Sequence, residues 1–230
     1  MTHNVEDVSS TSQPKLGDRF DQAFLFASHI HRSQVRKNSG NVPYASHLLG
    51  VAALVLEAGG DEDLAIAALL HDAAEDQGGR AMLNEIGNRF GQRVQHVVEG
   101  CSDTFELPKP PWMARKQAYI SHISKFADFD VCLVSAADKV HNARTILTDH
   151  RQIGDEVFDR FKASKEETLW YYGELVPAFR RARERNSSPG RNDRGLTRLL
   201  DELEATVSEL IQRAGTGPQQ LTGADHAADD

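Results

Sequence analysis

Residues 67–77 read A-A-L-L-H-D-A-A-E-D-Q, a run of small and apolar residues that continues directly into ionisable ones. Apolar runs belong in protein cores, whereas carboxylates are rarely buried without a partner. On a single helix over residues 61–77, the spacing of the ionisable side chains puts all of them in one sector about one turn long. The ionisable residues are His71, Asp72, Glu75 and Asp76.

Three carboxylates at the edge of a core would repel one another strongly unless a cation compensates them. A divalent metal ion is the simplest such cation, because imidazole and carboxylate ligands suit manganese, iron, zinc or cobalt. A lone His-Asp pair could instead be an ion pair on a surface helix. Two further acids one turn later make that interpretation weaker. The pattern therefore predicts a buried metal site.

Two adjacent residues supply only part of a coordination shell, so further ligands are expected from elsewhere in the chain. Residues 132–144, C-L-V-S-A-A-D-K-V-H-N-A-R, again interrupt an apolar helical stretch, with Asp138 followed four positions later by Asn142. His47, which opens a helix after P-Y-A-S, is a third candidate.

The composition bounds the class of protein. The chain has 230 residues, 40% of them hydrophobic, which is enough for one fairly large domain with a real core. The formal net charge of −8 argues against non-specific nucleic-acid binding, which needs an excess of Lys and Arg. The polar, acidic N-terminus has no signal-peptide pattern and no apolar run reaches membrane-spanning length, so we expect a soluble cytoplasmic protein without a membrane partner.

Helical periodicity dominates and no strand pattern or repeat stands out, so we expect an all-α fold, a compact bundle of many helices. Composition predicts a disordered leader over 1–15, a main domain over 16–185 and a polar linker over 186–195. A last amphipathic helix over 196–213 carries a stripe of leucines, and a disordered tail follows over 214–230. The stripe could dock on the body or pair with a second copy in a homo-oligomer.

Several of these motifs together resemble one protein family. P-Y-A-S-H (43–47), A-A-L-L-H-D-A-A-E-D (67–76) and A-A-D-K-V-H-N (136–142) are similar to the ordered signatures of the HD superfamily. More narrowly, R-K-N-S-G-N-V-P-Y-A-S-H (36–47) and F-G-Q-R-V-Q-H-V-V-E-G-C-S-D (90–103) resemble segments of the alarmone-hydrolase domain of RelA/SpoT homologues, especially its stand-alone small form. The resemblance runs from about residue 20 to 175, with five motifs in the family's order.

The resemblance implies an HD-type bundle and assigns roles to particular residues. The implied ligands of a divalent ion, usually manganese in this family, are His47, His71, Asp72 and Asp138. Glu75 and Asp76 match the acidic pair beside the attacking water, although the sequence does not tell which of them is the base. The implied nucleotide-binding residues are Arg36, Lys37, Tyr44 and Asn142.

The implied reaction is metal-dependent removal of the 3′-pyrophosphate from guanosine tetra- or pentaphosphate. Two alternatives stay open: the same chemistry on another phosphorylated nucleotide, such as an adenosine alarmone or NADPH at its 2′-phosphate, or a non-catalytic nucleotide-binding module. Trp112 stands where some relatives offer a lysine toward phosphate, and Lys109, Arg115 and Lys116 are candidates to replace it.

Overall fold

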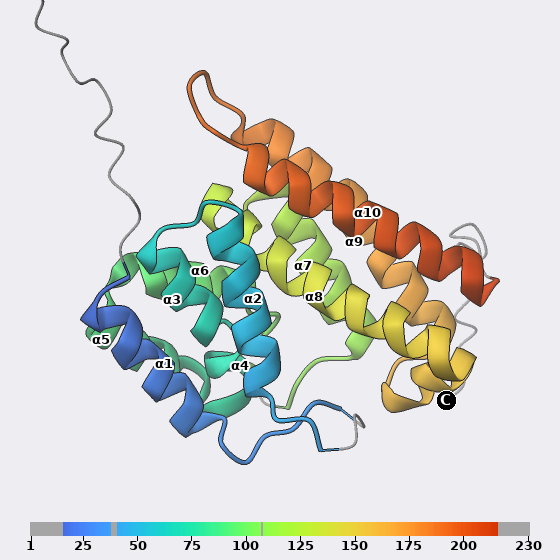
Figure 1. The fold of residues 1–230 in the computed structure, drawn as a ribbon, viewed down its shortest axis with the longest axis horizontal. Coiled ribbons are helices and arrows are strands. Elements are labelled where there is room, and N and C mark those ends of the chain that lie inside the picture. Colours follow the sequence, from blue (N-terminus) through green and yellow to red (C-terminus); the bar gives the residue numbers. More distant parts are fainter. Residues whose placement is uncertain (1–15, 38–40, 107, 216–230) are drawn as a thin grey trace, which may run out of the picture.

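The computed structural model describes residues 16–37, 41–106 and 108–215, and within these residues the fold is all-α, as predicted (Figure 1). A single antiparallel bridge, Val35 to Pro43, is the one piece of extended pairing there. The helices are α1 (Asp18–Ile30), α2 (Ala45–Glu57), α3 (Glu62–Leu70), α4 (Ala73–Gln77), α5 (Gly79–Phe90), α6 (Gln92–Cys101), α7 (Trp112–Lys125), α8 (Phe129–Ile153), the 3₁₀ turn η1 (Gly154–Arg160), α9 (Lys165–Asn186) and α10 (Arg194–Ala214).

Side-chain caps mark where three of these helices begin. The Asp61 carboxylate accepts the Leu64 N–H at the start of α3, and Asp128 caps α8 in the same way through Val131. Ser164 and Glu167 form a reciprocal capping box at α9. Each cap satisfies N–H groups that have no partner within the helix.

The single helix expected over 61–77 is wrong, because the chain breaks between α3 and α4 at His71 and Asp72. The His71 Nδ1 lies 2.8 Å from the Ala68 carbonyl oxygen, which would accept the Asp72 N–H in an uninterrupted helix. Asp72 has φ −95° and ψ −6°, outside ordinary helical values, and α4 begins after it. The ionisable residues therefore sit at a helix junction rather than along one helical face.

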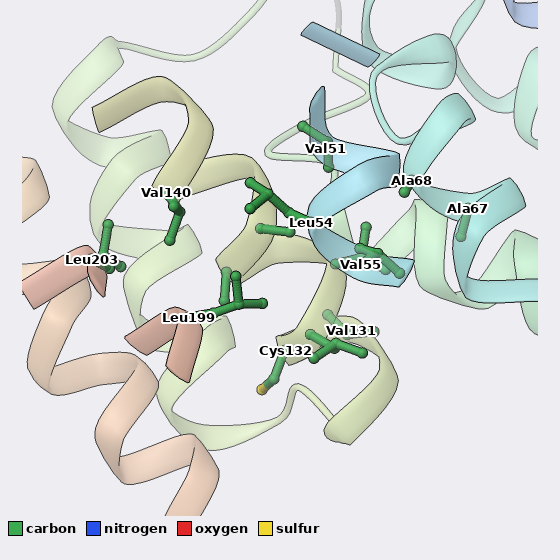
Figure 2. Close-up of a cluster of buried hydrophobic side chains, with 14 of the residues drawn as sticks. Val51, Leu54, Val55, Ala67, Ala68, Val131, Cys132, Val140, Leu199 and Leu203 are labelled. Atoms are coloured by element: carbon green, nitrogen blue, oxygen red, sulfur yellow. The ribbon is translucent and has the colours of Figure 1, made fainter. Parts of the chain in front are cut away.

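The core lies where α2, α3 and α8 meet. Every α3 residue from Leu64 to Leu70 is buried, so this helix is apolar on all sides and is enclosed by its neighbours. Figure 2 shows Val51, Leu54 and Val55 of α2 among buried side chains of α3, α8 and α10. This packing surrounds the His71–Asp72 junction with apolar side chains.

The apolar stripe of the last helix docks on the body of the same chain. Leu199, Leu203 and Leu210 are almost fully buried, and α10 lies across α8 and α9 (Figures 1 and 2). Of the two placements open for this stripe, the structure has the intramolecular one. The predicted leader, and the predicted tail from residue 216 onward, fall outside the described residues, and a homo-oligomer stays a prediction.

Among the helices of the described ranges, we find none with the length and apolar character needed to cross a membrane.

We expect Gly195→Ala to destabilise the fold by about 1–3 kcal/mol, the usual cost of overpacking. A Cβ at Gly195 would lie 1.8 Å from the carbonyl oxygen of Ala58, at the end of α2, so backbone would have to move. This cost should override the gain of about 1 kcal/mol that alanine gives over glycine within a helix. Urea unfolding measures the change in stability.

Ser208→Ala, at an exposed position of the same helix, is the control and should leave stability unchanged or slightly raised. A Gly195→Ala protein as stable as the parent would show that α10 does not press on α2 as described.

Candidate metal centre

Three buried side chains from separate helices bring their donor atoms together. His47 lies in the first turn of α2, His71 follows the end of α3, and Asp138 lies in the middle of α8. One ligand atom from each lies within 4.8 Å of the other two. The three residues are 0%, 2% and 6% exposed, respectively, so all three are buried.

The two histidines present ring nitrogens that the protein leaves unsatisfied. The Nε2 atoms of His47 and His71 are buried without a hydrogen bond of acceptable geometry among the described residues. Carboxylate oxygens nevertheless lie 3.0–3.7 Å from them. Ligand bonds of about 2.1 Å place neighbouring ligand atoms about 3.0–3.4 Å apart on one ion, so this spacing fits a shared cation.

The other nitrogen of His71 explains why Nε2 faces the cluster. Nδ1 must donate to the Ala68 carbonyl oxygen, so the neutral ring has its lone pair on Nε2, which faces the cluster. The same hydrogen bond ends α3, so one contact both interrupts the helix and aims the ligand.

Asp72 completes the group from its more exposed side. Its Oδ2 lies 3.0 Å from His71 Nε2 and 3.6 Å from His47 Nε2. The Tyr44 hydroxyl donates to the same oxygen at 2.5 Å. Burial and the Asp72 charge raise the pKa of Tyr44, so the hydroxyl keeps its proton and remains a donor.

Asp138 is held on both of its oxygens. Asn142 donates to Oδ1 at 2.5 Å, and the Lys139 ammonium lies 2.7 Å from Oδ2. Burial by itself would raise the pKa of Asp138, but the Lys139 ammonium and the neighbouring His47 and His71 rings lower it well below the usual range. Asp138 is therefore an anion at neutral pH, as a metal ligand must be.

The loop before α2 reaches the cluster through Arg36. Its guanidinium donates to Asn142 Oδ1 at 2.7 Å and lies 5.7 Å from the centre of the Tyr44 ring. Backbone hydrogen bonds from Arg36 to Val42 and from Tyr44 to Gln34 fold the loop back on itself. Lys37 is exposed at the open edge of this loop, beside Arg36.

Asp76 is bonded to the loop between α1 and α2. Gln34 donates to Asp76 Oδ2 at 2.8 Å. The side-chain oxygen of Gln34, Oε1, lies 2.6 Å from His31 Nδ1 and accepts a hydrogen bond from Gln77 Nε2 at 2.8 Å. These contacts orient the side-chain amide nitrogen of Gln34 toward Asp76. Burial and the nearby Asp72 charge raise the pKa of Asp76, while the Gln34 hydrogen bond opposes the rise.

Glu75 turns to the opposite side and meets the loop after α6. Its carboxylate pairs with Lys109 at 2.9 Å and accepts the Asp103 N–H at 3.2 Å. Arg115 and Lys116 both pair with the nearly buried Asp103 carboxylate, at 2.5 and 2.7 Å. Of the three basic residues proposed to replace the missing lysine, Lys109 is therefore the one that lies beside the acidic pair.

Sequence reasoning missed the residues that support these groups. His141 was not singled out, yet its Nδ1 lies 3.0 Å from His47 Nδ1. Burial, then His47 and Arg36, lower the pKa of His141 to about 4, so the ring is neutral. The sequence offered only a weak signal for it, since His141 lies one helical turn after Asp138. The other residues missed were His31, Gln34, Gln77 and Lys139.

Comparisons with known proteins identify the family of this chain. A family model described as "HD domain" matches residues 23–167. The chain is 39% identical over 127 residues to the guanosine-3′,5′-bis(diphosphate) 3′-pyrophosphohydrolase MESH1 of Xenopus tropicalis, which covers 54% of this chain and 68% of that protein. It is 33% identical over 163 residues to the bifunctional (p)ppGpp synthase/hydrolase SpoT of Escherichia coli K12, or 69% of this chain and 21% of SpoT.

A solved structure shares the fold. It was reported as a metazoan ortholog of SpoT that hydrolyses ppGpp, and it superposes with a TM-score of 0.64 at 22% identity. The superposition covers 88% of this chain and 99% of that one, so the similarity in fold extends beyond the metal centre.

We expect Asp72→Asn to weaken the binding of a divalent metal by more than the roughly 10–100-fold loss of affinity that follows removal of a residue supporting a ligand, so the dialysed protein should retain little metal. The amide lacks the negative charge that faces His47 and His71. Metal content is measured by mass spectrometry of the digested protein. Asp149→Asn, which removes a carboxylate paired with Arg160 in the same protein, is the control; full metal content in Asp72→Asn would exclude Asp72 as a ligand.

Proposed function

This chain belongs to the HD domain family, and from its metal centre and its relatives we propose that it hydrolyses guanosine tetra- or pentaphosphate to GDP or GTP and pyrophosphate. One observation carries the chemistry: two buried imidazole nitrogens without hydrogen bonds face two carboxylates. The substrate is inferred from the relatives, which are a guanosine-3′,5′-bis(diphosphate) 3′-pyrophosphohydrolase and a bifunctional (p)ppGpp synthase/hydrolase. The bond cut joins the pyrophosphate to the ribose 3′ oxygen.

His47, His71, Asp72 and Asp138 would hold the divalent ion, which we propose to be Mn²⁺. Mixed imidazole and carboxylate ligation suits manganese. Such an ion would lower the pKa of a bound water toward neutrality and would offset the charge of the two aspartates, so that phosphate could approach these acidic residues.

Asp76 is the better of the two candidates for the proton-accepting group. Its raised pKa makes it a stronger base than an ordinary aspartate, and it is held in place by Gln34 rather than by a cation. Glu75 is already engaged by Lys109 and by the Asp103 N–H. We propose that Asp76 takes the proton from the attacking water, and that Glu75 positions Lys109 toward the phosphates.

The nucleotide would enter beside the loop that carries Arg36 and Lys37. Arg36 offers a planar fork for phosphate and a flat face for a base, and Lys37 adds a mobile charge at the exposed edge. Tyr44 and Asn142 line the path between this loop and the metal ligands, since each bonds to one of the ligand aspartates.

A nucleotide panel tests the proposal. The purified protein with Mn²⁺ is incubated with ppGpp, pppGpp, the adenosine counterparts and NADPH, and the products are separated by ion-exchange chromatography. We expect GDP or GTP with pyrophosphate in equal amounts. Cleavage of only the adenosine compounds or NADPH would show that the substrate is not a guanosine phosphate. A metal-loaded protein that cleaves none of these compounds would indicate a non-catalytic nucleotide-binding module.

We expect Asp76→Asn to slow ppGpp hydrolysis at least ~100-fold while the protein keeps its metal. The amide still fills the space beside Gln34, but it cannot accept a proton. Turnover and metal content are measured on the same preparation, with Asp72→Asn as the contrasting variant that loses both. Near-normal turnover in Asp76→Asn would remove Asp76 from the proton transfer.

Gln34→Ala should shift the acidic limb of the pH profile of kcat/KM to higher pH. The Gln34 hydrogen bond favours the charged form of Asp76, so its loss raises the pKa of Asp76, and the active deprotonated form then appears only at higher pH. Gln77→Ala, which removes only a donor to Gln34, should shift it less. A lower rate with an unmoved profile would contradict this role.

A further inference from the structure

His47 turns its second ring nitrogen toward another histidine rather than toward backbone or a carboxylate. We propose that His141 is a positioning residue for the metal centre, which fixes the tautomer and the ring orientation of His47. The inference rests on His47 as a metal ligand, as proposed above, and it gives a role to the histidine of the A-A-D-K-V-H-N motif, to which the sequence analysis assigned none.

The contact between the two rings fixes which of them donates the hydrogen bond. His47 and His141 face each other through Nδ1 at 3.0 Å, so one nitrogen must donate and the other accept. His47 presents Nε2 to the cluster, and a metal ligand needs a lone pair there, so its proton is on Nδ1. His47 is therefore the donor, and His141 accepts through a lone pair on its own Nδ1.

The Nδ1 proton of His71 has a different kind of acceptor. Its Nδ1 donates to the Ala68 carbonyl, a backbone acceptor that no side-chain substitution can remove. His47 depends instead on a side chain from another helix, α8. The two imidazole ligands thus have acceptors of different kinds, and only that of His47 can be deleted by mutation.

Gly50 provides the space that this contact needs. A Cβ at Gly50 would lie 2.3 Å from both Cδ2 and Nε2 of His141. Gly50 follows His47 by three residues in the interior of α2, where glycine costs about 1 kcal/mol relative to alanine. Its backbone φ is not in the left-handed region, so the glycine serves close approach rather than chain conformation.

Helix α8 carries both residues that contact the ring nitrogens of His47. Asp138 and His141 are three residues apart on this helix, so one turn presents a carboxylate to His47 Nε2 and an acceptor to His47 Nδ1. The rings of His47 and His141 meet edge to face, with centroids 4.8 Å apart. The orientation of His47 is thereby coupled to the position of α8.

The test measures the affinity of the metal-free protein for Mn²⁺ in the absence of nucleotide, by isothermal titration calorimetry. His141→Phe keeps a ring but removes the acceptor, and we expect the dissociation constant to rise about 10–100-fold. His141→Asn places a side-chain oxygen near the position of Nδ1 and should stay within about three-fold of the parent. His150→Phe, a buried histidine of the same helix that pairs with Asp155, is the matched control and should leave the affinity unchanged.

Thermal unfolding in EDTA establishes that each variant is folded before its affinity is compared. Gly50→Ala is a second test of the same contact. It keeps the His141 residue, but its new methyl group would displace the His141 ring. It should weaken Mn²⁺ binding in the parent and have little further effect in a His141→Ala background.

The inference is overturned if folded His141→Phe binds Mn²⁺ as tightly as the parent, or if Phe and Asn weaken binding equally, which would indicate packing alone. Gly50→Ala with parental affinity would also overturn it. These outcomes are independent of catalysis: a parent that binds Mn²⁺ through this arrangement but does not cleave ppGpp loses only the proposed function. A parent that binds no Mn²⁺ refutes both.

Discussion

Two imidazole nitrogens and two carboxylates are turned toward one another inside an apolar core, and the rest of the site follows from that arrangement. His47 and His71 use Nδ1 for hydrogen bonds to His141 and the Ala68 carbonyl, so only Nε2 is left to face Asp72 and Asp138. Burying such a group without a cation would be costly, because unpaired buried polar atoms and like charges both destabilise the folded state. The surrounding helices bury these side chains, and a bound divalent ion would offset the cost of burying them.

The loop that would meet the nucleotide is connected to the metal ligands by side-chain hydrogen bonds. Tyr44 bonds Asp72 directly, and Arg36 reaches Asp138 through Asn142. Gln34, two residues before Arg36, holds Asp76. The residues proposed to contact substrate, to bind the metal and to accept the proton are therefore linked through this loop, so a substitution in the loop should affect metal binding as well as nucleotide affinity.

Much of the fold was predictable because its signals are local. Apolar periodicity indicated an all-α protein, and Asp61 marked the true start of α3 through its cap. The break at His71 was not predictable, since it depends on a side chain that takes a carbonyl from its own helix. The helix-sector argument nevertheless identified residues that do cluster, because Asp72 and Asp76 remain close across the junction. The placement of the leucine stripe of α10 also needed the structure, since a partner chain could have buried it equally well.

By itself, the sequence determined the chemical character of the site: which residues carry imidazole or carboxylate, and that acids following an apolar run call for a cation. It could not determine the supporting partners. His141 accepts from a histidine 94 positions away in the sequence, and Gln34 bonds an aspartate 42 positions away. Only tertiary packing decides which atoms of these residues meet, because a hydrogen bond requires alignment within tenths of an ångström, which spacing along one helix cannot specify for another.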